Sequence, residues 1–181
     1  NSVGLQAIDP TNGAALWEHP FQKKQFPRCV QPLLASEGRI VLGANMDFGT
    51  RLITATKGAT GWEAKENWTN AKHRPYFNDN VGIKEAIYGF DGNRLCCVDL
   101  NTGETKWQGE RCGGQVMALP DMELILVLTE KGEVLLVKAD PAAYTEVASF
   151  KALTGKTWNH PVIANGHLFV RNSTEMACFK L

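Results

Sequence analysis

Short apolar runs alternate with clusters of Gly, Asn, Asp and Pro along the whole chain, and the stretch 87–107 shows the pattern most clearly. Its apolar runs Ile87–Phe90 and Leu95–Leu100 are separated by Asp91-Gly92-Asn93, and Asn101-Thr102-Gly103 separates the second run from Glu104–Trp107. An Asp-Gly pair between apolar runs is typical of a β-hairpin. The stretch therefore predicts three consecutive antiparallel strands.

The turn in this stretch occurs twice, because the segment 7–17 aligns with the segment 97–107. The shared residues are Asp9, Gly13 and Trp17 in the first copy and Asp99, Gly103 and Trp107 in the second. We expect the Asp to accept hydrogen bonds from the turn, the Gly to supply a positive φ, and the Trp to pack between neighbouring elements. Weaker copies occupy 54–68, 137–150 and 176–181, and Pro141–Tyr144 is expected to form one helical turn.

Further strand pairs lie between these copies, each pair with its own turn. Four strands in a unit of about 40 residues are typical of the blades of a β-propeller. The sequence predicts an all-β fold, a single partial propeller domain over 1–181 made of four-stranded antiparallel blades, with about four blades' worth of strands. The blade pieces are expected at 3–18, 29–70, 78–111, 114–151 and 158–181. A β-sandwich is the competing fold, but it gives no reason for the Asp-Gly-Trp unit to recur.

Composition excludes some classes of function. The 19 Lys and Arg residues balance the 19 Asp and Glu residues, so no basic excess points to nucleic acid. No apolar run is long enough to cross a bilayer as a helix. Five cysteines without Cys-x-x-Cys spacing favour free thiols over a zinc site or a disulfide framework.

The Asp-Gly-Trp units resemble the tryptophan-docking repeats of quinoprotein-type propellers, and the resemblance covers nearly the whole chain. Segments such as Tyr76-Phe77-Asn78-Asp79 and Thr157-Trp158-Asn159-His160-Pro161 are similar to bacterial PQQ-binding-like repeat proteins, many of which are called polyvinyl alcohol dehydrogenase-like. The resemblance implies a propeller and a periplasmic or other extracytoplasmic location. It also implies that the chain is the C-terminal half of a longer protein, because such propellers have seven or eight blades. Four blades' worth of strands must close as a small ring, pair with a second copy as a homodimer, or join the other half.

The entries to the innermost strands carry the polar residues of greatest interest. By register, these entries lie at one mouth of the central channel, and the residues expected there are Gln31, Asn78, Asp79, Gln115, Trp158, Asn159 and His160. Convergent polar groups beside an aromatic wall are what a ligand site needs. The alternative, that these residues cap strands and line a water-filled channel, stays open.

No catalytic residue is assigned by the sequence. Cys96 and Cys97 are adjacent, as in quinoprotein dehydrogenases, but successive strand residues point to opposite faces, so both are expected in the core. The three histidines His19, His73 and His167 are isolated and expected at the surface. The family resemblance admits pyrroloquinoline quinone and calcium as cofactors, but no calcium-loop spacing supports them.

Three functions remain on this basis. The preferred one is a non-catalytic propeller that binds a protein, a peptide or a glycan, with no nucleic acid and no membrane span. The second is part of a quinone-dependent alcohol dehydrogenase, and the third is a scaffold alone.

Overall fold

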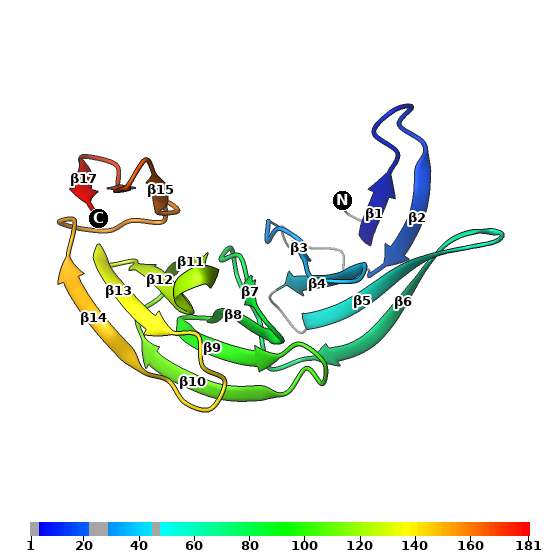
Figure 1. Ribbon diagram of the computed structural model, residues 1–181, viewed down its shortest axis with the longest axis horizontal. Helices are drawn as coiled ribbons and strands as arrows, with labels where there is room; N and C mark the ends of the chain where they lie inside the picture. The colour runs from blue at the N-terminus through cyan, green and yellow to red at the C-terminus, as the bar shows by residue number, and fades with distance from the viewer. Residues whose placement is uncertain (1–3, 22–28, 45–47) are drawn as a thin grey trace.

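The structure is a computed structural model and describes residues 4–21, 29–44 and 48–181. Residue 3 and residues 45–47, which fall within two of the expected blade pieces, lie outside this description. The described residues form antiparallel sheets placed side by side along an open arc (Figure 1). The prediction of an all-β fold built from four-stranded antiparallel blades is confirmed.

Three sheets are complete four-stranded blades, and each is a meander that follows the sequence. The first contains β3 (Leu33–Leu34), β4 (Arg39–Ala44), β5 (Gly49–Gly58) and β6 (Gly61–Asn70). The second contains β7 (Val81–Ile83), β8 (Ala86–Asp91), β9 (Arg94–Asp99) and β10 (Thr105–Arg111). The third contains β11 (Gly114–Leu119), β12 (Leu124–Thr129), β13 (Glu133–Lys138) and β14 (Glu146–Lys151).

The position of a strand within its blade follows its polarity. The inner strands β3, β7 and β11 border the concave side of the arc, and the outer strands β6, β10 and β14 form its convex side (Figure 1). Strand β12 is an apolar run that is buried from Ile125 to Thr129, because a neighbouring blade covers each of its faces. Strand β14 is exposed along its whole length.

Two smaller sheets lie at the ends of the arc. One is the hairpin of β1 (Gly4–Ile8) and β2 (Ala15–Pro20). The other contains β15 (Val162–Ala164), β16 (His167–Arg171) and β17 (Met176–Lys180). They stand on opposite sides of the opening in Figure 1, so closure of the chain into a small ring is not the arrangement seen.

The two copies of the repeated turn have the same hydrogen bonds. The N–H of Gly13 donates to the carbonyl of Asp9 at 2.8 Å, and the N–H of Gly103 donates to the carbonyl of Asp99 at 2.9 Å. Each Asp also accepts backbone N–H groups through its Oδ1 atom. The φ angles of Gly13 and Gly103 are 75° and 76°, in the left-handed region that favours glycine.

Large aromatic residues of the outer strands reach into the following blade. The indole N–H of Trp68 on β6 donates to the carbonyl of Leu100 at 2.9 Å, and the indole N–H of Trp107 on β10 donates to the carbonyl of Asp140 at 2.8 Å. The ring of Trp68 lies so close to Gly103 that a Cβ atom there would come within 2.6 Å of it. Each indole therefore bonds the turn that joins the third and fourth strands of the next blade.

Local structure departs from the sequence predictions in one segment. Pro141–Tyr144 forms a turn and not a helix, because Asp140 Oδ1 accepts the N–H of Ala142 at 2.8 Å and so competes with a helical bond. A short 3₁₀ helix, η1, forms at Pro120–Met122 between β11 and β12, where a proline suits the first position. In the part of the chain that the structure describes, no helix is long and apolar enough to span a membrane.

The adjacent cysteines lie in the core, as the strand pattern predicts. Cys96 and Cys97 on β9 are fully buried, and Cys97 belongs to the apolar cluster between the second and third blades. Burial raises the pKa of each thiol to about 11. Both thiols are therefore protonated and unreactive at neutral pH.

Candidate functional site

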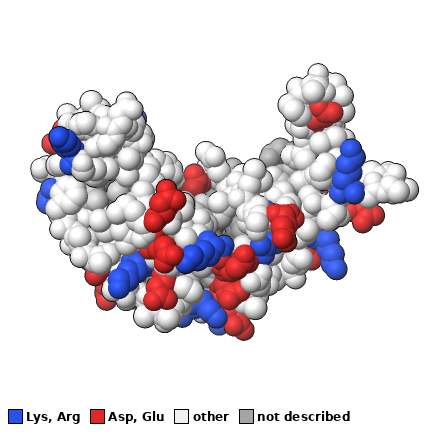
Figure 2. Space-filling model, viewed as in Figure 1, with Lys and Arg blue, Asp and Glu red and all other residues white. Residues whose placement is uncertain are grey.

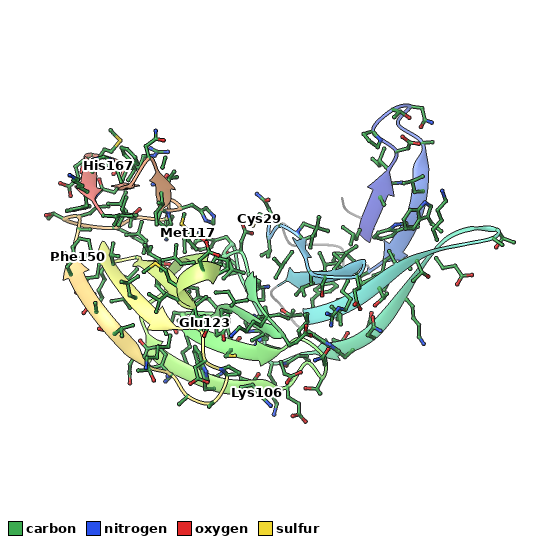
Figure 3. All side chains as sticks on the ribbon, in the orientation of Figure 1. Cys29, Lys106, Met117, Glu123, Phe150 and His167 are labelled. Carbon is green, nitrogen blue, oxygen red and sulfur yellow. The ribbon has the colours of Figure 1, made fainter. Side chains whose placement is uncertain are left out.

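The candidate site is formed by the segments that cross from the outer strand of one blade to the inner strand of the next. The thiol of Cys29, which precedes β3, donates to the carbonyl of Tyr76, which precedes β7, across 3.7 Å. Cys29 lies at the inner edge of the arc in Figure 3. The entries to the first two inner strands are therefore neighbours on the concave side.

Asp79 connects three of the crossing segments. Its Oδ1 atom accepts the backbone N–H of Gln31 at 2.7 Å, and its Oδ2 atom lies 3.6 Å from Nε2 of His160. Asp79 precedes β7, whereas His160 precedes β15, so this contact passes over the intervening blade. Three of the residues that the sequence places at the channel mouth are thus brought together.

Two buried amides join the remaining entries. Asn78 is 2% exposed, and its Nδ2 donates to the carbonyl of Gly114 at 2.5 Å. Gln115 is also 2% exposed, and its Nε2 donates to the carbonyl of Trp158 at 3.3 Å. The other end of this amide, the Oε1 atom of Gln115, is buried without a hydrogen-bond partner. Burying a polar atom in this state costs about 1–3 kcal/mol.

Asn159 is the predicted residue that turns away from this group. Its Nδ2 donates to the carbonyl of Arg171 at 3.4 Å, which lies within its own sheet. Its backbone N–H bonds Thr157 Oγ1 at 3.2 Å. Asn159 therefore holds the segment that leads into β15. The expected strand register does not indicate this role.

An exposed aromatic group adjoins these polar residues. Trp158 is 56% exposed, and its ring centroid lies 5.9 Å from that of Phe77 in an edge-on arrangement. The Phe77 ring in turn meets Tyr76, which is 52% exposed, at 5.5 Å. The Lys156 ammonium lies 4.2 Å from the centre of the Trp158 ring. We call Asp79, Gln115, Trp158, His160, Phe77 and Tyr76 the channel-mouth cluster.

Three residues of the site were not predicted from the sequence, namely Tyr76, Phe77 and Lys156. Tyr76 and Phe77 directly precede Asn78, and Lys156 lies two residues before Trp158, so their proximity in sequence was a usable signal. The structure adds that Tyr76 is exposed, whereas Phe77 is half-buried.

His73 corrects a second expectation. It was placed at the surface, but it is 1% exposed, and its Nε2 lies 3.0 Å from Oδ1 of Asn80. Because an amide oxygen only accepts, Nε2 carries the proton, and Nδ1 is left buried without a partner. Burial lowers the pKa of His73, so the neutral ring is favoured. His73 is a packed structural residue beside the cluster.

The residues present do not fit calcium bound beside a quinone. Among the described residues, no group of three or more His, Cys, Asp and Glu side chains is arranged to hold a metal ion. At the channel mouth, Asp79 already bonds Gln31 and faces His160, and the amide of Asn78 is bound to Gly114. Calcium takes six to eight oxygen ligands, roughly, and these side chains do not supply them.

Comparison with known proteins gives one family and several related folds. A family model described as outer membrane protein assembly factor BamB matches residues 2–178. No curated protein matches the chain. The solved structure of AztD from Citrobacter koseri is 15% identical with a TM-score of 0.61 and covers 98% of this chain. BamB from Moraxella catarrhalis is 14% identical with a TM-score of 0.52 and also covers 98%.

A computationally designed protein, Ika8, has the same fold, with 10% identity, a TM-score of 0.58 and 99% of this chain covered. The chain spans 49% of the length of AztD and 66% of the length of BamB and of Ika8. At these identities, the likeness to solved structures is one of fold. With most of its length matched by the family model, the chain belongs to the PQQ-like β-propeller family of outer membrane protein assembly factor BamB.

Proposed function

We propose that this protein is a binding scaffold whose ligand docks on the channel-mouth cluster. The observation that carries the proposal is the pair of exposed aromatic residues Tyr76 and Trp158, 52% and 56% exposed, which both contact Phe77 edge-on at the channel mouth. A structural tie between blades needs no exposed ring, whereas large apolar side chains gathered on a surface mark binding sites. A ligand with an apolar face can cover both rings.

The fold supports a scaffold for a physical reason. The crossing segments carry the binding groups, whereas the strands that hold them form continuous sheets with buried faces between the blades. A ligand can therefore meet side chains from several blades whose positions are fixed. The family description, an outer membrane assembly factor, supports an extracytoplasmic location and a role in binding.

Two parallel screens test the proposal without assuming the kind of ligand. A phage-displayed library of random peptides and a printed glycan array are probed with the protein and with the Trp158→Ala/His160→Ala double variant. We expect at least one screen to give ligands whose binding is lost in the double variant. Equal melting temperatures of the two proteins exclude loss through unfolding.

The matched control is Trp62→Ala, because Trp62 is another exposed tryptophan but lies on β6, in the hairpin away from the channel mouth. Its ligands should be those of the unaltered protein. If neither screen gives a ligand, or if every ligand is retained by the double variant, the cluster is a structural tie and the proposal is wrong.

A further inference from the structure

We propose that the turn of the β1–β2 hairpin is a docking site for a tryptophan side chain carried by the outer strand of a further blade. This turn, residues 9–13, has the same Asp-Gly spacing as the turn 99–103 between β9 and β10. The turn 99–103 is covered by Trp68, whereas no described residue takes the matching place at Gly13. The site uses no residue of the channel-mouth cluster.

The covered turn shows what such a site binds. The indole N–H of Trp68 donates to the carbonyl of Leu100 at 2.9 Å, and its ring lies 2.6 Å from the Cβ position of Gly103. Two residues further along β6, Nδ2 of Asn70 donates to the carbonyl of Gly103 at 2.8 Å. Leu100 and Gly103 are both buried as a result. The turn therefore binds a Trp-x-Asn strand through two carbonyls and the bare surface of a glycine.

The turn 9–13 has the same backbone geometry and stands open. Gly13 has a φ of 75°, against 76° for Gly103, and its N–H makes the same bond to the carbonyl of the turn aspartate. Among the described residues, no atom lies within 4 Å of a Cβ atom built on Gly13. Pro10, which aligns with Leu100, is exposed, and so is Gly13. Figure 2 shows the tip of the hairpin projecting from one end of the arc, clear of the other sheets.

The occupant we assign is an outer strand of a blade outside these 181 residues. Of the aromatic residues at the docking position of the outer strands, Trp68 and Trp107 are already docked, and Trp17 belongs to the same hairpin as the turn. Phe150 contacts Phe179 and has no N–H to donate. AztD and BamB share this fold, and the chain spans 49% and 66% of their lengths, so related propellers possess further chain that can supply such a strand.

Nuclear magnetic resonance titration of the unaltered chain tests the proposal. The probe is a synthetic peptide with the sequence of residues 63–70, which contains Trp68 and Asn70 and no other tryptophan. One docked side chain with two hydrogen bonds binds weakly, so we expect a dissociation constant in the millimolar range. The backbone amide signals of residues 11–14 should shift with this peptide. The same peptide with Trp68→Ala should leave them in place.

Two glycine variants separate the docking surface from backbone strain. Gly13→Ala places a methyl group where the indole ring would lie, so the peptide should bind about tenfold more weakly. Gly92→Ala is the matched control, because Gly92 has a φ of 58° and no described atom within 4 Å of its Cβ position. This control should bind the peptide like the unaltered chain.

The proposal is overturned if the signals of residues 11–14 do not shift, or if the two peptides shift them equally. Equal binding by Gly13→Ala and Gly92→Ala would also overturn it. If Gly13→Ala has a lower melting temperature than Gly92→Ala, the comparison of the two peptides on the unaltered chain decides. Sedimentation equilibrium tests the source of the strand, and we expect a monomer. A dimer that Gly13→Ala dissociates would show that a second copy covers the turn and would overturn the further blade as occupant.

Discussion

Replacing Gly103 by alanine should separate the contribution of backbone conformation from that of the contact with Trp68. Gly103 has a φ of 76°, and a Cβ atom built on it would lie 2.6 Å from two ring carbons of Trp68. Gly92, in the same blade, has a φ of 58° and nothing within 4 Å of such an atom. Gly92→Ala is therefore a matched control with backbone strain alone.

The expected magnitudes follow from these distances. An alanine in the left-handed region costs about 1–2 kcal/mol, and both variants carry this term. Carbon atoms attract best at about 3.5–4.0 Å, so Gly103→Ala also forces the Trp68 ring to move, which costs about 1–3 kcal/mol. The ring cannot yield freely, because its indole N–H is bonded to the carbonyl of Leu100. Gly103→Ala should lower the free energy of unfolding by about 2–5 kcal/mol, against about 1–2 kcal/mol for Gly92→Ala.

Equilibrium unfolding in urea, followed by circular dichroism, measures both values. The same pair of substitutions is then made in a Trp68→Leu background, in which the ring is absent. In that background, Gly103→Ala should cost no more than Gly92→Ala. The difference in the cost of Gly103→Ala between the two backgrounds then gives a coupling free energy of about 1–3 kcal/mol between positions 68 and 103. Equal costs for the two glycines in the unaltered background would refute the contact between blades.

Three further predictions concern the core. Trp107→Ala should lower the free energy of unfolding by about 3–5 kcal/mol in urea titration, and a loss below about 1 kcal/mol would show that its ring does not join two blades. Burial lowers the pKa of His73 below the ordinary 6.5, so the free energy of unfolding should fall as the pH drops below 6.5, with a slope approaching about 1.4 kcal/mol per pH unit. His73→Gln should flatten this dependence when melting temperature is measured against pH. A pH dependence that is unchanged in the variant would contradict the prediction. A maleimide at pH 7.5 should label exposed Cys29 within minutes, whereas buried Cys96 and Cys97 should react only on unfolding. Peptide mass spectrometry measures the labelling of each cysteine. Equal labelling rates for all three would exclude the burial of Cys96 and Cys97.

The fold could be predicted because its determinants are local. Asp99 and Gly103 are four residues apart, and both form their turn contacts within that distance, so the spacing alone indicates the turn. Strand order within a blade also follows the sequence, which is why the entries to the inner strands could be placed at one mouth. Asp79 contacts both Gln31 and His160, whereas the role of this group as a ligand site stays a prediction.

What the sequence left undetermined depends on contacts between distant segments. His73 is buried because Asn80 and the neighbouring strands surround it, and nothing in its own sequence context differs from that of a surface histidine. Asn159 bonds the carbonyl of Arg171 and not the cluster, and spacing along the sequence does not indicate this partner. The exposure of Trp158 likewise depends on how segments distant in sequence pack around it. From the sequence alone, a tryptophan at that position could equally be a buried ring docked between blades.

The meander order of the three complete blades has a consequence for how the chain folds. Every strand within a blade pairs with the strand just before or after it in sequence, so the hydrogen bonds of a blade close only short loops. Low average sequence separation of this kind allows fast formation of each sheet, before contacts between sheets exist. The docking of Trp68 and Trp107 then joins finished neighbours one after another, so assembly can begin at any blade and spread along the chain.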